Sequence, residues 1–129
     1  MLKIALSFIA LGLVVVSCTT GTTSSPKPEK VRLARVVVDS AQLDSYKAFL
    51  KEEIEMSVQK ESGVLTLYAV FEKERPTHLT ILEMYATEAA YKAHLQTPHF
   101  IKYKEGTKDM VKSLELVETD PLIPTLKIK

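Results

Sequence analysis

The stretch THLTILEMYATEAAYKAHLQTPHF, residues 77–100, decides how the folded part of this chain is organised. Its first ten residues are rich in β-branched and aliphatic side chains, and they predict a strand over 77–86. Thr87 is a good N-terminal cap for a helix directly after that strand. Thr97 caps a further helix, because Pro98 stands in the first turn, where its missing N–H is not needed. We therefore expect one strand followed by two short, separately capped helices.

The third of these predicted elements extends towards the C-terminus. We expect the helix that begins at Pro98 to include Phe100, Tyr103 and Met110, unless Gly106 interrupts it. The segment SLELVET, residues 113–119, alternates apolar and polar side chains and predicts a half-buried strand.

Upstream of residue 77 the pattern predicts two strands with a long helix between them. VRLARVVVD, residues 31–39, is rich in β-branched residues and predicts a strand. From residue 41 to about 61, apolar side chains recur three or four positions apart, which predicts a helix ended by Gly63. The run 63–74 predicts the strand that forms a hairpin with 77–86. The expected helical stripe comprises Leu43, Tyr46, Leu50, Ile54 and Val58.

The order strand, helix, strand, strand, helix pair, strand is that of the split βαβ, ferredoxin-like α+β sandwich. Helices cover one face of such a sheet. Aliphatic residues are expected on both faces, so a homodimer with its sheets packed face to face would cover the second one. The aliphatic strand residues are Val36, Val38, Leu65, Leu67, Leu82 and Met84.

The N-terminal segment MLKIALSFIALGLVVVSC has the form of an export signal that ends in a lipobox. We expect residues 1–17 to be a signal peptide and Cys18 to carry lipid. The polar residues 18–30 then form a flexible tether, 31–120 the folded domain and 121–129 a tail that the sequence does not place. The predicted location is the bacterial cell envelope, with the domain exported and lipid-anchored to the membrane.

The charge balance excludes an obvious electrostatic partner. The chain has 17 basic and 16 acidic residues, and removal of residues 1–17 takes away Lys3 alone, which leaves 16 of each. Without a basic excess, nucleic-acid binding is not expected. Only four glycines are present, and no glycine-rich phosphate loop or serine nucleophile elbow can be recognised.

The segment ILEMYATEAAYKAHLQTPHFIKY, residues 81–103, contains Glu-x-aromatic, then Ala-His, then Thr-Pro-His-Phe. It resembles the antibiotic biosynthesis monooxygenase domain family, especially its quinol-monooxygenase-like members. The resemblance covers about residues 31–120, and Glu61-Ser62-Gly63 fits the Glu-x-Gly turn of the family. It implies a dimeric α/β barrel with a pocket between sheet and helices. Many members are thought to oxidise quinols or polyketide-like phenols with O2, using no flavin, haem or metal, so no cofactor is expected.

Two departures from the family pattern narrow the choice of branch. The haem-degrading members rely on an Asn, a Trp and a His, whereas this chain has neither Asn nor Trp and carries Lys104 near the position of that histidine. The Glu-x-Trp common in the family is here Glu83-Met84-Tyr85, which keeps an aromatic wall and adds a hydroxyl.

Cofactor-free oxygenation of a phenol needs a base, because the phenolate gives an electron to O2 more readily than the phenol does. Histidine suits this role near neutral pH. The candidate proton acceptors are therefore His94 and His99, although a histidine at either helix end also has a purely structural explanation. Glu83 and Tyr85 are expected to orient the ring. The expected pocket-lining or core residues are Phe49, Met56, Tyr68 and Phe100, and His78 is expected on the surface.

No metal site is expected from the two histidines. A five-residue spacing across a helix break does not place them on one helical face, and Glu83 is the only nearby carboxylate that the local sequence suggests.

The sequence as a whole supports two hypotheses of function. The first is a lipid-anchored, dimeric enzyme that oxidises a quinol or related small aromatic; the second is a non-catalytic ligand-binding or interaction lipoprotein that keeps the same fold.

Overall fold

The computed structural model of the chain describes residues 27–126 and residue 128. The predicted signal peptide, Cys18 and residues 18–26 of the predicted tether lie outside the described residues. The elements are β1 (Lys30–Val38), a 3₁₀ turn (Ser40–Gln42), α1 (Leu43–Lys60), β2 (Val64–Phe71), β3 (His78–Tyr85), α2 (Glu88–His94), α3 (Pro98–Thr107) and β4 (Val111–Thr119). β1 thus begins one residue before the predicted domain boundary.

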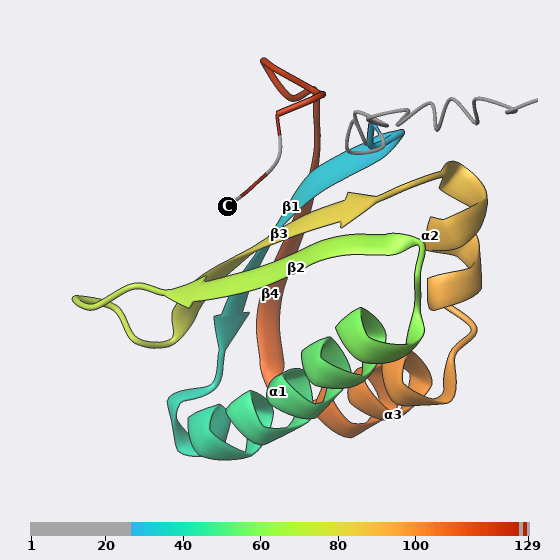
Figure 1. Cartoon of the computed structure of the whole chain (residues 1–129). Helices are drawn as coiled ribbons and strands as arrows, with labels where there is room; N and C mark the ends of the chain where they lie inside the picture. Colours follow the sequence, from blue (N-terminus) through green and yellow to red (C-terminus); the bar gives the residue numbers. More distant parts are fainter. Residues whose placement is uncertain (1–26, 127, 129) are drawn as a thin grey trace, which may run out of the picture.

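The four strands form one antiparallel sheet in the order β2-β3-β1-β4, with α1 and α3 packed side by side on one of its faces (Figure 1). α2 lies at the end of the sheet where β3 finishes, and it leads the chain down to α3. This arrangement confirms the ferredoxin-like α+β fold. The strand and helix order expected from the sequence is also the observed one.

The two helix junctions are built by the residues that the sequence singled out. The Thr87 hydroxyl accepts the N–H of Ala90 at 2.9 Å, and the Thr97 hydroxyl accepts the N–H of Phe100 at 3.3 Å. Pro98 is the first residue of α3. The caps satisfy N–H groups that have no partner within their own helix, so each helix begins where its threonine stands.

The region around Gly106 differs from the prediction. Gly106 lies within α3 and does not interrupt the helix, while Met110 lies beyond the helix, in the turn before β4. A Cβ atom at position 106 would stand 2.4 Å from a ring carbon of Phe49. Glycine at this position therefore allows α3 to approach the Phe49 ring of α1, and it does not break the helix.

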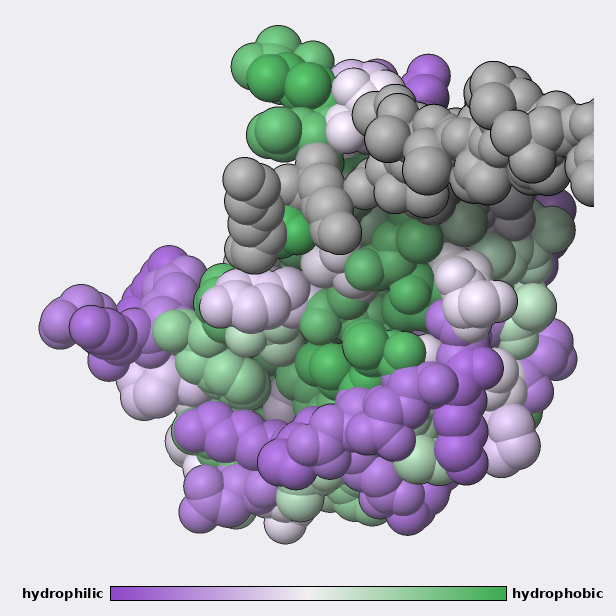
Figure 2. Space-filling view, in the orientation of Figure 1, coloured by the Kyte–Doolittle hydropathy of each residue, from purple (hydrophilic) through white to green (hydrophobic). Residues whose placement is uncertain are grey.

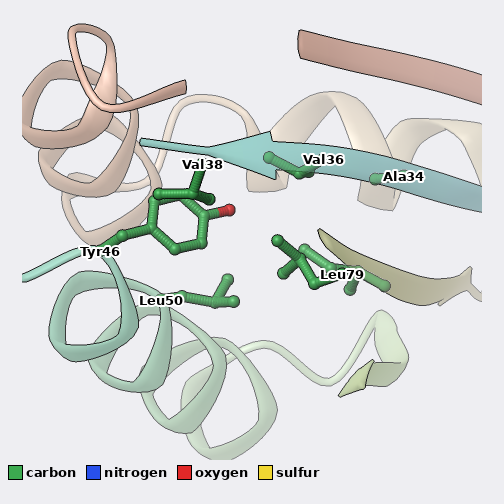
Figure 3. Close-up of a cluster of buried hydrophobic side chains, with 7 residues drawn as sticks. Ala34, Val36, Val38, Tyr46, Leu50 and Leu79 are labelled. Carbon is green, nitrogen blue, oxygen red and sulfur yellow. The ribbon is translucent and has the colours of Figure 1, made fainter. Parts of the chain in front are cut away.

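The core lies between α1 and the covered face of the sheet. Tyr46 is fully buried among Leu50 of its own helix and Val38 of β1 (Figure 3), and its hydroxyl lies 2.7 Å from that of Tyr103. The buried positions of α1 are Tyr46, Leu50, Glu53 and Ser57. Val58, expected in the apolar stripe, is 54% exposed, because the buried face continues from Leu50 to positions 53 and 57 instead.

The other face of the sheet carries the alternate side chains of the same strands. Leu82 and Met84 alternate with Ile81, Glu83 and Tyr85, whose side chains face the helices and are buried. Figure 2 shows hydrophobic side chains gathered over the sheet, above the strip of hydrophilic side chains on the helical layer. The structure therefore places aliphatic residues on both faces, as expected, and the face-to-face homodimer stays a prediction.

The tail that follows β4 forms no strand in residues 121–126. It makes a turn in which the N–H of Leu126 donates to the carbonyl of Ile123.

Among the helices of residues 27–126, none combines the length and the hydropathy that a membrane span requires.

Candidate active site

A cavity of about 560 Å³ lies between the covered face of the sheet and the three helices. β1 and β3 form its floor, and α1, α2 and α3 form its walls. Much of the lining is apolar, and the exposed side chains of Leu114 and Leu116 on β4 stand at its open side. The polar side chains of the lining that matter below are Arg32, Glu53, Glu83, Tyr85, Tyr91 and His94.

The sheet side of the cavity holds a closed network around Arg32. Its Nε–H donates to Glu83 Oε2 at 2.7 Å, and its Nη1 donates to the Tyr91 hydroxyl at 2.9 Å. The Tyr85 hydroxyl donates to the same Glu83 oxygen at 3.1 Å. Burial and then the Glu83 carboxylate raise the pKa of Tyr85, so this hydroxyl stays protonated and remains a donor.

The charge of Arg32 is retained despite its burial. Burial alone would lower the pKa of its guanidinium, but the Glu83 charge and hydrogen bond outweigh burial and raise it. The guanidinium also lies over the Tyr91 ring, 4.6 Å from the centroid. Arg32 and Glu83 consequently form a buried pair of one positive and one negative charge. We name these four residues, Arg32, Glu83, Tyr85 and Tyr91, the sheet cluster.

The helix side of the cavity is centred on His94, the last residue of α2, which is only 2% exposed. Its ring lies 4.9 Å from that of Phe100 and 5.4 Å from that of Tyr85, centroid to centroid. His94 Nδ1 is 3.1 Å from Glu61 Oε1, and its Nε2 is 3.5 Å from Glu53 Oε1. One imidazole is thus placed between two carboxylates.

Glu61, directly after α1, also joins the second histidine. His99 Nε2 lies 2.5 Å from the same Glu61 oxygen that faces His94. Burial would raise the pKa of Glu61, but the hydrogen bonds from His99 and His94 outweigh burial and hold this pKa below its usual range. Glu61 is therefore an anion that accepts a hydrogen bond from each imidazole.

Glu53 has the opposite electrostatic character. It is buried on α1 and accepts the Ser57 hydroxyl at 2.9 Å. Burial raises its pKa above the usual range, and the Ser57 hydrogen bond and the two histidines offset this only in part. The group Glu53, Glu61, His94 and His99, which we name the helix-end cluster, therefore contains one carboxylate that favours the anion and one that favours the neutral acid.

A close backbone approach holds α2 against the turn that carries Glu61. The Gly63 carbonyl accepts the N–H of Ala86 at 2.8 Å. A Cβ atom at position 63 would lie 2.5 Å from the Cβ of Ala90. Glycine at this turn allows α2, and with it His94, to lie next to Glu61.

The profile of a family described as antibiotic biosynthesis monooxygenase matches residues 31–106, which include both clusters. This chain belongs to that family. No curated protein shows a significant match to the chain.

Solved structures of family members agree. A protein from Bacteroides thetaiotaomicron, named after the same family, is 64% identical, with 78% of this chain and 95% of that chain covered and a TM-score of 0.77. One from Lactobacillus acidophilus, named a monooxygenase, is 31% identical over 68% of this chain and 42% of that chain, with a TM-score of 0.67. One from Nitrosomonas europaea is 20% identical, with 72% of this chain and 98% of that chain covered and a TM-score of 0.68, and this likeness shows the fold alone.

In this monooxygenase-family domain, four of the residues selected from the sequence line the cavity: Glu83, Tyr85, His94 and Phe100. His99 bonds to Glu61, and neither of these two residues lines the cavity. Phe49 packs against Gly106, and Met56 is a half-buried residue of α1. Tyr68 is 66% exposed on the uncovered face of the sheet, because it alternates with Leu67, which faces the cavity. Phe49, Met56 and Tyr68 therefore do not line the cavity. His78 is half-buried at the start of β3, beside Thr77.

The domain also uses polar residues that were not selected from the sequence, namely Arg32, Glu53, Glu61 and Tyr91. A signal existed for two of them. Arg32 alternates with Ala34 and Val36 and so shares their face of β1, while Glu53 lies three residues after Leu50 on the helical stripe. Glu61 was noted only as part of a turn, and the distance of 33 positions from His94 hid its role.

Proposed function

We propose that this protein is a monooxygenase that oxidises a quinol or a related small aromatic with O2 and without a bound cofactor. The observation that carries the proposal is the position of His94, which lines a largely apolar cavity and has Glu61 against its Nδ1 atom. Family membership supports oxygen chemistry in general, whereas the substrate class rests on this cavity.

In the proposed reaction His94 accepts the proton of a phenolic hydroxyl. Glu61 accepts the N–H at Nδ1, which leaves Nε2 as the basic nitrogen, in the tautomer that a general base requires. His99 binds the same Glu61 oxygen and positions it. Because His94 lines the cavity and His99 does not, His94 is the proton acceptor and His99 a positioning residue.

The electrons for the reaction come from the substrate. The phenolate passes one electron to O2, the two radicals combine at ring carbon, and loss of water from the resulting hydroperoxide gives a hydroxyquinone. Quinol and O2 together supply all the atoms of the hydroxyquinone and one water. One oxygen atom enters the product, the other leaves as water, and no further reductant is needed.

The sheet cluster orients the ring in this proposal. Arg32 and Glu83 neutralise each other, so the cavity floor offers fixed polar contacts without a strong net charge. Phe100 and Leu67 supply apolar walls for a flat ring. A cavity of about 560 Å³ is within the range that holds a small organic ligand.

Oxygen consumption tests the proposal. The purified full-length protein is incubated with a panel of hydroquinones, and O2 uptake above autoxidation is measured for the wild type, His94→Gln, His99→Gln and the control His78→Gln. We expect His94→Gln to lower kcat by at least 100-fold, His99→Gln by about tenfold, and His78→Gln to have no effect.

Two outcomes would overturn this assignment. If O2 uptake survives in His94→Gln, His94 is not the proton acceptor. If the wild type never exceeds autoxidation yet binds the quinols, the protein is the ligand-binding alternative.

We further propose that the domain acts as a homodimer through the uncovered face of the sheet, and that it is exported and lipid-anchored at Cys18. The exposed Tyr68 and Val70 on that face support the first proposal, and the lipobox sequence supports the second. A monomeric mass by light scattering at micromolar concentration would exclude the dimer. An unmodified Cys18 in the mass spectrum of the membrane-extracted protein would exclude the anchor.

A further inference from the structure

Three helix ends converge beside the cavity, and each contributes one group able to bind a metal. Glu61 follows the last residue of α1, His94 ends α2, and His99 lies in the first turn of α3. One atom from each, Glu61 Oε1, His94 Nδ1 and His99 Nε2, lies within 4.8 Å of the other two.

We propose that Glu61, His94 and His99 bind a divalent transition metal ion, with Zn²⁺ as the best fit. Two imidazole nitrogens and one carboxylate oxygen form a three-residue ligand set that zinc accepts, and a water molecule fills the fourth position. Mg²⁺ and Ca²⁺ prefer ligand sets made of oxygen, so they fit this site poorly.

The spacing of the three atoms is close to what a tetrahedral ion needs. With metal–ligand bonds of about 2.1 Å, neighbouring ligand atoms stand about 3.4 Å apart. The distance from His94 Nδ1 to Glu61 Oε1 is 3.1 Å, and that from His99 Nε2 to the same oxygen is 2.5 Å. A shift of His99 by roughly 1 Å would therefore bring its Nε2 atom to the distance from Glu61 that a tetrahedral ion needs.

The group behind His94 provides independent support. Imidazoles that bind a metal through one nitrogen commonly donate the other N–H to a carboxylate, which fixes their orientation. His94 Nε2 faces Glu53 Oε1 at 3.5 Å, and Glu53 is itself held by the Ser57 hydroxyl. A carboxylate, that of Glu53, thus already lies next to the His94 nitrogen that would not bind the metal.

The site can also be reached from solvent. The side chains of Glu61 and His99 keep 14% and 9% of their surface exposed, whereas that of His94 keeps 3%. An ion can therefore enter past Glu61 and His99, and the buried imidazole completes its coordination. The bound ion would link the ends of three helices.

Metal binding has a consequence for catalysis that rests on the proposed function. In the metal-bound state His94 coordinates through Nδ1 and carries its proton on Nε2, where it donates to Glu53. His94 then has no free lone pair to accept a phenolic proton. Metal binding should therefore inhibit quinol oxidation, and the metal-free protein is the active form.

Calorimetric titration of the purified, chelator-treated full-length protein with Zn²⁺ tests the binding. We expect one ion per chain for the wild type and for the control His78→Ala. Glu61→Gln and His99→Ala should each raise Kd at least tenfold, because each removes one ligand. Circular dichroism establishes that the variants are folded.

X-ray absorption at the zinc edge of the wild type gives a readout that depends on no variant. We expect a shell of nitrogen and oxygen that includes two imidazoles and no sulfur, which also separates this site from binding at Cys18. Three results would each overturn the proposal: no stoichiometric Zn²⁺ binding, a sulfur ligand, or the same affinity for Zn²⁺ in Glu61→Gln and His99→Ala as in the wild type. Zinc binding by a protein that consumes no O2 would leave the metal site standing and remove the proposed oxidation.

Discussion

The two polar clusters at the cavity compensate their buried charged groups with different partners. In the sheet cluster one guanidinium faces one carboxylate, and the two tyrosine hydroxyls complete the hydrogen bonds of Arg32 and Glu83. In the helix-end cluster two carboxylates face two imidazoles, and the pKa shifts of Glu53 and Glu61 have opposite directions. The sheet cluster thus pairs one positive with one negative charge, whereas the helix-end cluster contains one carboxylate that favours the anion and one that favours the neutral acid.

The largest effect is expected from breaking the sheet cluster at Arg32. Arg32→Met leaves the buried Glu83 carboxylate without its cation, which should lower the free energy of unfolding by about 3–5 kcal/mol. Urea denaturation at pH 7 measures it. The double variant Arg32→Met/Glu83→Met removes both charges and should recover most of the loss; if it does not, the charge pair is not what stabilises this wall.

A smaller loss is expected from the helix-end cluster at Glu61. Glu61→Gln removes the anion that accepts from two imidazoles, at a cost of about 2 kcal/mol at pH 7. The pKa of Glu61 is lower in the folded state than its ordinary 4.5, so its stabilisation is complete above about pH 4.5 and disappears as pH falls through the folded value. Urea titrations of the chelator-treated variant and wild type should therefore converge in acid. A constant difference at every pH would mean that the charge of Glu61 is not the source of its stabilisation.

Glu53 should show the reverse dependence of stability on pH. Burial raises its pKa in the folded state, so ionisation of Glu53 costs stability as pH rises from 4.5 through the folded pKa. The stability of Glu53→Gln relative to the wild type should therefore increase over this range and then level off. The same urea titrations measure it. A relative stability that falls with pH would show that Glu53 is stabilised mainly as an anion beside His94.

The smallest effect is expected at the edge of the sheet cluster. Tyr85→Phe removes one hydroxyl donor to Glu83, which keeps its bond to Arg32, so the loss should be about 1 kcal/mol in thermal or urea unfolding. The matched control is Tyr68→Phe on the exposed face, which should change stability by less than about 0.5 kcal/mol. Equal effects at both positions would mean that the Tyr85 hydroxyl does not hold Glu83.

The parts of the fold that local chemistry determines were predictable. Thr87, Thr97 and Pro98 start two helices through hydrogen bonds within a few residues, and the observed caps agree with the sequence. The role of Gly106 could not be predicted because it is set by Phe49, a residue of another helix. A glycine that breaks a helix and a glycine that admits a neighbouring ring look the same in one sequence.

The site divides in the same way. His94 could be selected from its type and its place at a helix end, but its two carboxylate neighbours come from α1 and the turn after it. No spacing rule connects residues 53, 61 and 94. The local sequence suggested Glu83 alone as a carboxylate for the two histidines, and the expectation of no metal therefore omitted Glu61, which bonds to both of them.

The contact between Gly63 and Ala90 bears on how this domain evolves. One added carbon at position 63 would meet the Ala90 side chain at 2.5 Å, so a larger residue at position 63 requires Ala90 and its helix to move. Positions 63 and 90 are therefore expected to covary among related sequences, because the size of one limits the size of the other.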